Sequence, residues 1–303
     1  MNKHFVLIVS GGRTATNFLG NFLSEIIEGA YSVHEPDTSG GFDRKTWEGI
    51  KTFGVYQMVL GRILGLTGLR NLNENFLASN ISFDNLIKSL KKYRKQYYSS
   101  LNTNMIIESN KNWSGILPAV PKLFQHYKVL GIIRDPRSWV VSVQNKRRLL
   151  REQNLIYKLR FKKNQINEKI LKKQHKLHKL ADFEGICWNW VKIYENINSF
   201  IENNPNTLLV RYEDLFQSNE RNKHFQNMLE FITNFEEKSF NYKFYPEILD
   251  KKTNISEKTY LSDWKAWKSE DAKQLNEICG SLMKKFGYGN EYEWIDKINA
   301  NDR

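Results

Sequence analysis

The chain has 303 residues, of which 40% are hydrophobic, and its 46 Lys or Arg against 33 Asp or Glu give a formal net charge of +13. This apolar content suffices for a large core and indicates a globular protein, whose length allows one large domain or two small ones. Because no domain boundary is evident, we expect one domain over residues 1–303. No apolar run is long enough for a signal sequence or a membrane span, so we expect a cytoplasmic protein. The two cysteines, Cys187 and Cys279, lie in apolar helical patterns, which predicts buried free thiols rather than a disulfide or a metal site.

The first informative segment, HFVLIVSGGRTATNFLGNFL, predicts a buried strand, a tight turn and an amphipathic helix. Gly11 and Gly12 allow the backbone to turn sharply, so the following amides can point at one spot, where the positive end of the helix dipole adds its field. Such a turn suits a phosphate or a sulfate. The residues predicted to line it are Gly12, Arg13, Thr14, Ala15, Thr16 and Asn17. The alternative is an ordinary turn in which Thr and Asn cap the helix.

This turn differs from the loops that bind nucleoside triphosphates. Neither glycine is followed by the Gly-Lys pair of the G-x-x-x-x-G-K-[ST] motif, and G-x-G-x-x-G is also missing. Without that Lys and the hydroxyl beside it, little would neutralise a β,γ-phosphate pair. The sequence therefore predicts a site for a compact anion with less charge than MgATP.

Further along the chain, predicted strands alternate with helices. Apolar runs predict strands at 4–9, 104–108, 128–133 and 207–211. Helical spacing predicts a core-facing helix over 183–201 and another that starts at Ser269 and ends at Gly287. The alternation indicates an α/β fold in which a central parallel sheet carries helices on both faces. The stretches 40–100 and 145–182 are predicted to be mainly helical insertions after strand ends, where lids and acceptor-binding walls occur.

A second anion site is predicted in KVLGIIRDPRSWVVSVQNKRR, which repeats the pattern of a strand, a turn and a helix that Pro136 helps to begin. Arg134 stands at the strand end, and Ser142 follows eight residues later inside the helix. A guanidinium and a hydroxyl can meet there on another phosphate. The alternative is a structural ion pair between Arg134 and Asp135.

Three motifs, SGGRTATNFL, IIRDPRSWVVS and LLVRYEDL, together resemble those of the sulfotransferases that use 3′-phosphoadenosine-5′-phosphosulfate (PAPS), in the same order and at similar spacing. The resemblance is closer to the carbohydrate and bacterial type. It extends to the C-terminal segments WKAW and GSLMKKFGY and covers most of the chain apart from the two insertions. It implies the P-loop-NTPase-like fold of that family, PAPS as the cofactor and adenosine 3′,5′-bisphosphate as the product.

In that family the first turn cradles the 5′-phosphosulfate, which implies this role for the backbone from Gly12 to Asn17 and for the side chains of Arg13, Thr16 and Asn17. The family often has Arg-Ser-Gly-Thr-Ser/Thr where this chain has Arg-Thr-Ala-Thr-Asn.

The family's strand-end Arg and the Ser eight residues later bind the 3′-phosphate, and Arg134 and Ser142 match them. Tyr212 matches the tyrosine near the adenine; its alternative role is to pack on the core.

Sulfonyl transfer to an alcohol or amine leaves an anionic 5′-phosphate, which the amides, Arg13 and the helix dipole can stabilise, and no metal is required. The acceptor must lose a proton to a carboxylate or imidazole within hydrogen-bonding reach. Some carbohydrate-type members carry this base on a glutamate near the position of Glu35, which is therefore our first choice. His34 is the second, and Glu108, at the end of a predicted strand, is the third. His34 and Glu35 could also be no more than a turn pair before Pro36.

The acceptor is a small molecule or a glycan, and a sugar, a glycolipid or a secondary metabolite would each fit. Between Lys146 and Lys179 there are 13 Lys or Arg against two Glu. This segment could be a solvated helix face, a funnel for an anionic ligand, or a patch that contacts nucleic acid or an anionic membrane. We expect no nucleic-acid partner, because Tyr157 and Phe161 do not form a stacking platform.

Two other functional classes stay open. One is a kinase-like phosphotransferase with an atypical loop, and the other is a non-enzymatic protein that binds nucleic acid or a membrane surface through 146–179. The oligomeric state is equally open.

Overall fold

The computed structural model describes residues 3–37, 44–60, 67–153, 182–251, 260–261 and 263–300. The chain divides into two compact units, each of which is treated by itself. The sheet unit comprises Met1–Ile133 and Asn196–Thr253, and the helical unit comprises Arg134–Glu195 and Asn254–Arg303. The expectation of one domain over 1–303 stays a prediction. In the described ranges, no helix is both long enough and apolar enough to cross a membrane.

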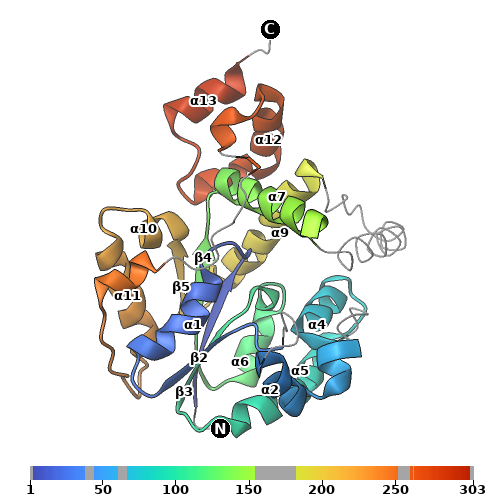
Figure 1. Ribbon diagram of the computed structural model, residues 1–303, viewed down its shortest axis with the longest axis vertical. Helices are drawn as coiled ribbons and strands as arrows, with labels where there is room; N and C mark the ends of the chain where they lie inside the picture. Colours follow the sequence, from blue (N-terminus) through green and yellow to red (C-terminus); the bar gives the residue numbers. More distant parts are fainter. Residues whose placement is uncertain are drawn as a thin grey trace. The chain divides into compact units, whose positions relative to one another are not determined.

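The sheet unit is built on five parallel strands in the order β2-β3-β1-β4-β5 (Figure 1). They are β1 His4–Ser10, β2 Ala30–His34, β3 Met105–Ser109, β4 His126–Ile133 and β5 Thr207–Arg211. β1 and β3 are buried along their whole length, as expected for parallel strands that are covered on both faces and read as continuous apolar runs. The predicted α/β fold with a central parallel sheet is confirmed.

Helices cover both faces of this sheet. The described helices that lie wholly in the sheet unit are α1 Thr16–Ile26, α2 Arg44–Phe53, η1 Tyr56–Leu60, α4 Gly68–Leu77, α5 Phe83–Ser100, η2 Lys111–Trp113, η3 Leu117–Ala119, α6 Val120–Leu123, α10 Tyr212–Phe216, α11 Arg221–Thr233 and η4 Pro246–Asp250. Val6 and Ile8 of β1 belong to an apolar cluster with α1 and α11. Phe5 stacks on Phe124 at 4.1 Å and meets Tyr98 of α5 at 5.1 Å between ring centroids. Since neighbouring strand residues point to opposite faces, both faces of β1 are covered.

The strand β2 was not among the predicted strands. Its sequence, AYSVH, is short and only half-buried at the edge of the sheet, so it carries a weak apolar signal. It pairs with β3, with His34 opposite Ser109, and α1 lies close against it. A Cβ on Gly20 of α1 would lie 2.7 Å from the Cβ of His34, and the Ser32 hydroxyl donates to the Gly20 carbonyl at 3.0 Å. Tertiary contacts rather than local pattern therefore define this strand.

The helical unit contains α7 Pro136–Gln153, the first part of α9 Phe183–Glu202, η5 Trp264–Ala266, α12 Ser269–Lys285 and α13 Tyr292–Asn299. The predicted helix starts at Pro136 and Ser269 are confirmed, and α12 ends just before Gly287, whose φ is 77°. Cys187 and Cys279 are buried free thiols, as predicted. The Cys279 thiol donates to the Cys187 carbonyl at 3.6 Å, and contact with Cys187 together with burial raises the pKa of Cys279.

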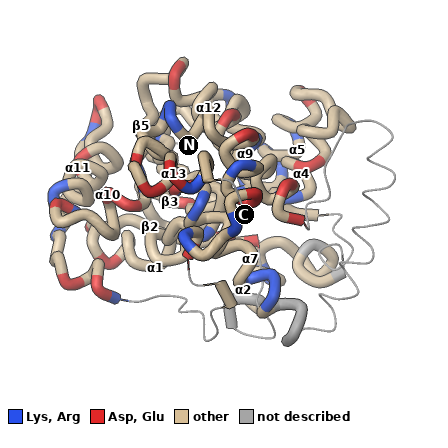
Figure 2. Tube along the Cα trace, turned by 90° about the horizontal axis from the view of Figure 1, so that it is seen from above, with Lys and Arg blue, Asp and Glu red and all other residues tan. Residues whose placement is uncertain are grey.

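The predicted insertion at 40–100 is mainly helical where it is described, in α2, η1, α4 and α5. In the second insertion, 145–182, α7 reaches Gln153 and residues 154–181 lie outside the described residues. Most of the basic segment 146–179 is therefore also outside them. Figure 2 shows both basic and acidic residues on α11.

Candidate active site

The turn after β1 has an unusual backbone. Gly12, Arg13 and Ala15 have φ values of 75°, 57° and 56°, in the left-handed region. For a residue with a side chain this conformation costs roughly 1–2 kcal/mol, so it persists only where the surroundings impose it. Ser10, fully buried at the end of β1, supplies part of that support: its hydroxyl oxygen accepts from the Gly12 N–H at 3.0 Å and from the Thr14 hydroxyl at 2.7 Å. The turn is thus held in shape by the protein.

The helix α1 begins at Thr16 without a side-chain cap, since Ala15 occupies the N-cap position. The first four N–H groups of a helix have no partner within the helix, and the dipole places partial positive charge there. The alternative of a turn capped by Thr or Asn side chains does not fit this geometry. Asn17 instead accepts from the Asn21 side-chain amide at 2.7 Å. A helix N-terminus without a side-chain cap, preceded by a strained turn, is an arrangement that suits an anion.

The side chains of the turn differ in exposure. Thr14 is fully buried and its hydroxyl braces Ser10, whereas Arg13 and Asn17 are partly exposed. Lys111, which the sequence analysis did not select, lies beside the turn: a Cβ on Gly12 would be 3.6 Å from its Cδ. Lys111 is exposed and follows β3, the strand next to β1. The described structure therefore adds a second cation to this turn.

His34 and Glu35 lie at the carboxyl end of β2. The Glu35 N–H donates to the Ser109 carbonyl at 3.0 Å, and Glu35 has a φ of 42°. Both side chains are partly exposed. Because β2, β3 and β1 are neighbouring parallel strands, their carboxyl ends share one edge, the usual ligand-binding edge of such sheets. That edge carries the turn, Lys111 and both proposed bases.

Glu108, the third predicted base, is fully buried and accepts four hydrogen bonds. Its partners are Arg94 Nη2 at 2.8 Å, Trp113 Nε1 at 3.1 Å, Asn110 Nδ2 at 3.1 Å, and the Tyr98 hydroxyl. A carboxylate whose oxygens are occupied in this way is a structural anion with no access to an acceptor. The geometry leaves Glu35 and His34 as candidates for the base.

The Glu108 cluster extends to the turn after β2. Arg94, 2% exposed, also pairs with Asp37 at 3.5 Å, and Asp37 accepts from the Leu69 N–H at 2.8 Å and the Tyr93 hydroxyl at 3.1 Å. Burial alone would raise the pKa of Asp37, but Arg94 and the Leu69 N–H hold it below its ordinary value. Since Asp37 is two residues after Glu35, this cluster fixes α4 and α5 to the candidate site.

No family model matches the chain, and no curated protein matches it. Among solved structures it is similar to the sulfotransferase STF9 from Mycobacterium avium, with a TM-score of 0.51 and 10% identity over 95% of this chain and 78% of that one. The chain has the sulfotransferase fold. Two sulfotransferase domains also match with TM-scores of 0.41: one from a Synechococcus olefin synthase, 17% identical over 86% of this chain and 78% of that one, and one from the curacin biosynthetic pathway, 16% identical over 97% and 96%. At these identities the likeness is one of fold.

On this sulfotransferase fold, Tyr212 follows β5 directly and begins α10. Its ring centroid lies 5.1 Å from that of Phe216. The ring also packs against the apolar cluster that β1 forms with α1 and α11. This contact agrees with the core-packing alternative, while a place beside adenine stays a prediction.

The predicted 3′-phosphate residues belong to the helical unit. Arg134 Nε donates to the Ser138 hydroxyl at 3.0 Å, and the Arg134 carbonyl accepts from Trp190 Nε1 at 3.0 Å. Asp135 pairs with Arg137, whose Nε lies 2.9 Å from Oδ1. Ser142 is partly exposed on α7. Their joint binding of a phosphate stays a prediction.

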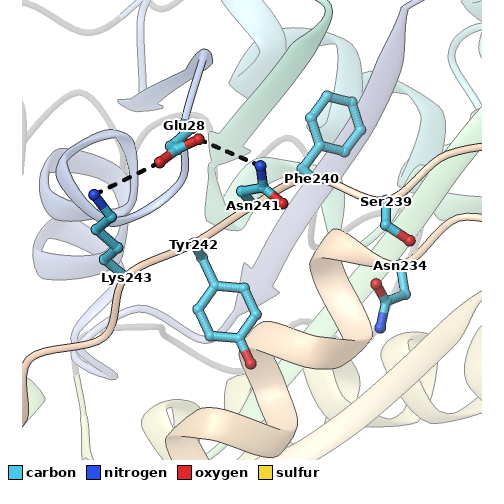
Figure 3. Close-up of a pocket in the computed structure, with 7 residues that line it drawn as sticks. All are labelled: Glu28, Asn234, Ser239, Phe240, Asn241, Tyr242 and Lys243. Carbon is cyan, nitrogen blue, oxygen red and sulfur yellow. Dashed lines mark hydrogen bonds and ion pairs between the residues drawn. The ribbon is translucent and has the colours of Figure 1, made fainter.

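Two pockets lie away from the turn. One, of about 500 Å³, is lined by Glu28, Asn234, Ser239, Phe240, Asn241, Tyr242 and Lys243 (Figure 3). It lies where Tyr242 bridges Ile27, at the opposite end of α1 from the turn. The other, of about 360 Å³, involves α4 and the last turns of α9. Neither contains a residue of the turn, so backbone geometry and not cavity size identifies the candidate site.

Proposed function

We propose that this protein is a sulfotransferase that moves a sulfonyl group from PAPS to a hydroxyl or amine of an acceptor. The observation that carries the proposal is the turn after β1, in which three left-handed residues lead into an uncapped helix on a sulfotransferase fold. The choice of PAPS as the cofactor rests on the three sequence motifs that resemble this family. Without the Gly-Lys pair, the same turn is poorly suited to MgATP.

In the proposed reaction the bond between sulfur and the bridging 5′-phosphate oxygen breaks as the acceptor oxygen or nitrogen bonds to sulfur. The electron pair of the broken bond stays on the 5′-phosphate of adenosine 3′,5′-bisphosphate. The amides from Gly12 to Asn17, the dipole of α1 and Arg13 stabilise that developing charge. Lys111, which lies against Gly12, adds a further cation. We assign the 3′-phosphate to Arg134 and Ser142 and the adenine to Tyr212.

The acceptor proton passes to Glu35, with His34 as the alternative base. Glu35 suits this task because it is partly exposed at the carboxyl edge and its backbone is fixed to Ser109. Glu108 has no such access.

The acceptor is a small molecule or a glycan. We place part of its binding wall on the segment from α2 to η1, which follows Glu35 in the chain and exposes three large side chains. These are Trp47, Val55 and Tyr56, which are 59%, 58% and 55% exposed. Exposed apolar side chains of this size and a π-helical turn are common at binding sites, which supports an acceptor with an apolar part, such as a glycolipid or a secondary metabolite.

The test is an acceptor screen with labelled PAPS, coupled to calorimetric titration with adenosine 3′,5′-bisphosphate. We expect the bisphosphate to bind without a metal ion and label to reach at least one acceptor. ATP with Mg²⁺ serves as the comparison ligand. Tight binding of MgATP with no binding of the bisphosphate would overturn the proposal in favour of a phosphotransferase.

A further inference from the structure

A second cluster of titratable side chains lies at the opposite, amino-terminal edge of the sheet. His4 begins β1 and His126 begins β4, and the two are direct partners in the strand register. Their ring centroids are 5.0 Å apart. Glu237 joins them from the turn after α11, with Oε2 at 3.1 Å from His126 Nδ1. One ligand atom from each of the three side chains lies within 4.8 Å of the others.

His4 is the unusual member of this cluster. Its side chain is more than nine-tenths buried, and neither ring nitrogen has a hydrogen-bond partner among the described residues. Phe235 and Phe240 enclose the ring edge-on, with centroids at 4.7 and 5.3 Å. Leaving a buried polar atom without a partner costs roughly 1–3 kcal/mol, so such atoms in native proteins nearly always bind another group, a water or an ion. The position calls for a ligand.

Backbone contacts hold the segment that carries Glu237. The Phe235 N–H donates to the Lys238 carbonyl at 2.9 Å, and Asn234 bridges Ser239, so that Glu237 lies in a tight turn. Figure 3 shows Asn234, Ser239 and Phe240 on this segment. The Glu237 side chain is 56% exposed, whereas that of His126 is 13% exposed. The cluster is therefore buried on the His4 side and open to solvent on the Glu237 side.

We propose that His4, His126 and Glu237 bind one divalent transition-metal ion of the zinc class. Two imidazoles and one carboxylate are a common zinc donor set, with a water completing the tetrahedron. Bonds of about 2.0–2.1 Å place tetrahedral ligand atoms about 3.4 Å apart, so the present spacings need only small side-chain rotations. The exposed side of the cluster admits the ion and the water.

The role of this ion is structural. β1 runs from His4 to Ser10, and at about 3.3 Å per residue the metal cluster lies roughly 20 Å from the turn that we assign to PAPS. The ion would fasten the starts of β1 and β4 to the turn after α11. Since it binds the folded chain, it raises the midpoint of thermal unfolding without entering sulfonyl transfer.

The test uses the full chain without a histidine tag, stripped with a chelator and titrated with Zn²⁺ in competition with a chromogenic chelator. We expect one Zn²⁺ per chain, a rise in the thermal midpoint, and the visible spectrum of tetrahedral Co²⁺ when Co²⁺ replaces it. Binding well below one equivalent, or an octahedral Co²⁺ spectrum, would overturn the proposal.

Variants distinguish the proposed zinc ligands from neighbouring residues that do not bind the ion. Glu237→Gln and His126→Gln should weaken Zn²⁺ binding at least about tenfold, whereas Glu236→Gln, at the neighbouring exposed position, should bind as the parent chain does. Glu237 is exposed, so its variant will fold. Equal binding by all three variants would exclude this site. None of these results bears on PAPS, so the two proposals fail independently.

Discussion

The two strand-to-helix turns that carry the predicted phosphate contacts are built differently. After β1, three left-handed residues lead into an uncapped helix, and a buried serine and a neighbouring buried charge cluster hold the strand ends in place. After β4, the helix starts at Pro136 without residues of positive φ, and the side chains pair among themselves, Arg134 with Ser138 and Asp135 with Arg137. The first turn offers backbone groups that its surroundings preorganise, and the second offers side chains on relaxed backbone.

Under the proposed function, this difference would give the two turns separate tasks. Preorganised amides and a helix dipole act most strongly on charge that develops during the reaction, whereas side chains that hold an unreactive phosphate act equally before and during it. Substitutions in the turn after β1, or in the buried residues that hold it, should therefore lower the free energy of unfolding or kcat. Substitutions in the turn after β4 should weaken cofactor binding.

The largest effect is expected from Arg94→Met, which removes the cation that Glu108 and Asp37 share. A buried carboxylate without its partner costs about 3–5 kcal/mol, measured as a loss in the free energy of unfolding in urea. Arg70→Met is the matched control, because its pair with Glu74 is 67% and 55% exposed and is worth less than about 1 kcal/mol. Because the pKa of Asp37 is lowered in the folded state, its contribution should be present at neutral pH and lost as the pH falls through that lowered pKa. Equal losses in the two variants would contradict the structural role of the cluster.

Glu35→Gln should preserve binding of adenosine 3′,5′-bisphosphate but lower kcat with an alcohol acceptor by about 10²–10⁴-fold, the usual contribution of a general base. It should also flatten the acidic limb of the pH–rate profile. His34→Ala is the companion variant: if it removes that limb and Glu35→Gln does not, the base is His34.

Arg13→Ala should lower kcat on the order of 10²-fold, because its charge matters most as the leaving phosphate forms. Calorimetry with adenosine 3′,5′-bisphosphate should show a much smaller change in affinity. Near-normal turnover would remove Arg13 from the reaction.

Arg134→Ala and Ser142→Ala should raise the KM for PAPS with little change in kcat. Loss of a charge-assisted hydrogen bond costs about 1.5–3 kcal/mol, so the Arg variant should lose on the order of 10- to 100-fold in affinity and the Ser variant less. Unchanged bisphosphate affinity in both would exclude this 3′-phosphate site.

The contrast between the turns also shows what the sequence could and could not predict. The turn after β1 was predictable because its strand, glycines and helix are contiguous. Lys111 was missed because its place beside Gly12 depends on β3 lying next to β1, an order that no local pattern encodes. Glu108 was named as a possible base because its charged partner, Arg94, lies in an insertion that the resemblance does not cover, and no local pattern shows that the two side chains meet.

The cluster at the amino-terminal edge of the sheet could not be predicted from local sequence either. His4, His126 and Glu237 are far apart in the chain, and only the strand register and the turn after α11 bring them together. β2 likewise depends on its contacts with β3 and α1. What the sequence left out is the set of contacts between distant segments.

The smallest effect, and the sharpest test of strain in the first turn, is expected from Ala15→Gly. Glycine adopts the φ of 56° without steric cost, which should stabilise the folded state by roughly 1–2 kcal/mol. Its greater freedom in the unfolded chain lowers the free energy of unfolding by about 0.4–1 kcal/mol. The net change in unfolding free energy should therefore lie between about zero and a gain of about 1.6 kcal/mol. Ala78→Gly, where φ is an ordinary −84°, is the control and should lose stability. A variant that is more stable but turns over more slowly would show that the side chain at position 15 keeps the amides aligned; a loss of stability equal to that of Ala78→Gly would show that the turn is not strained.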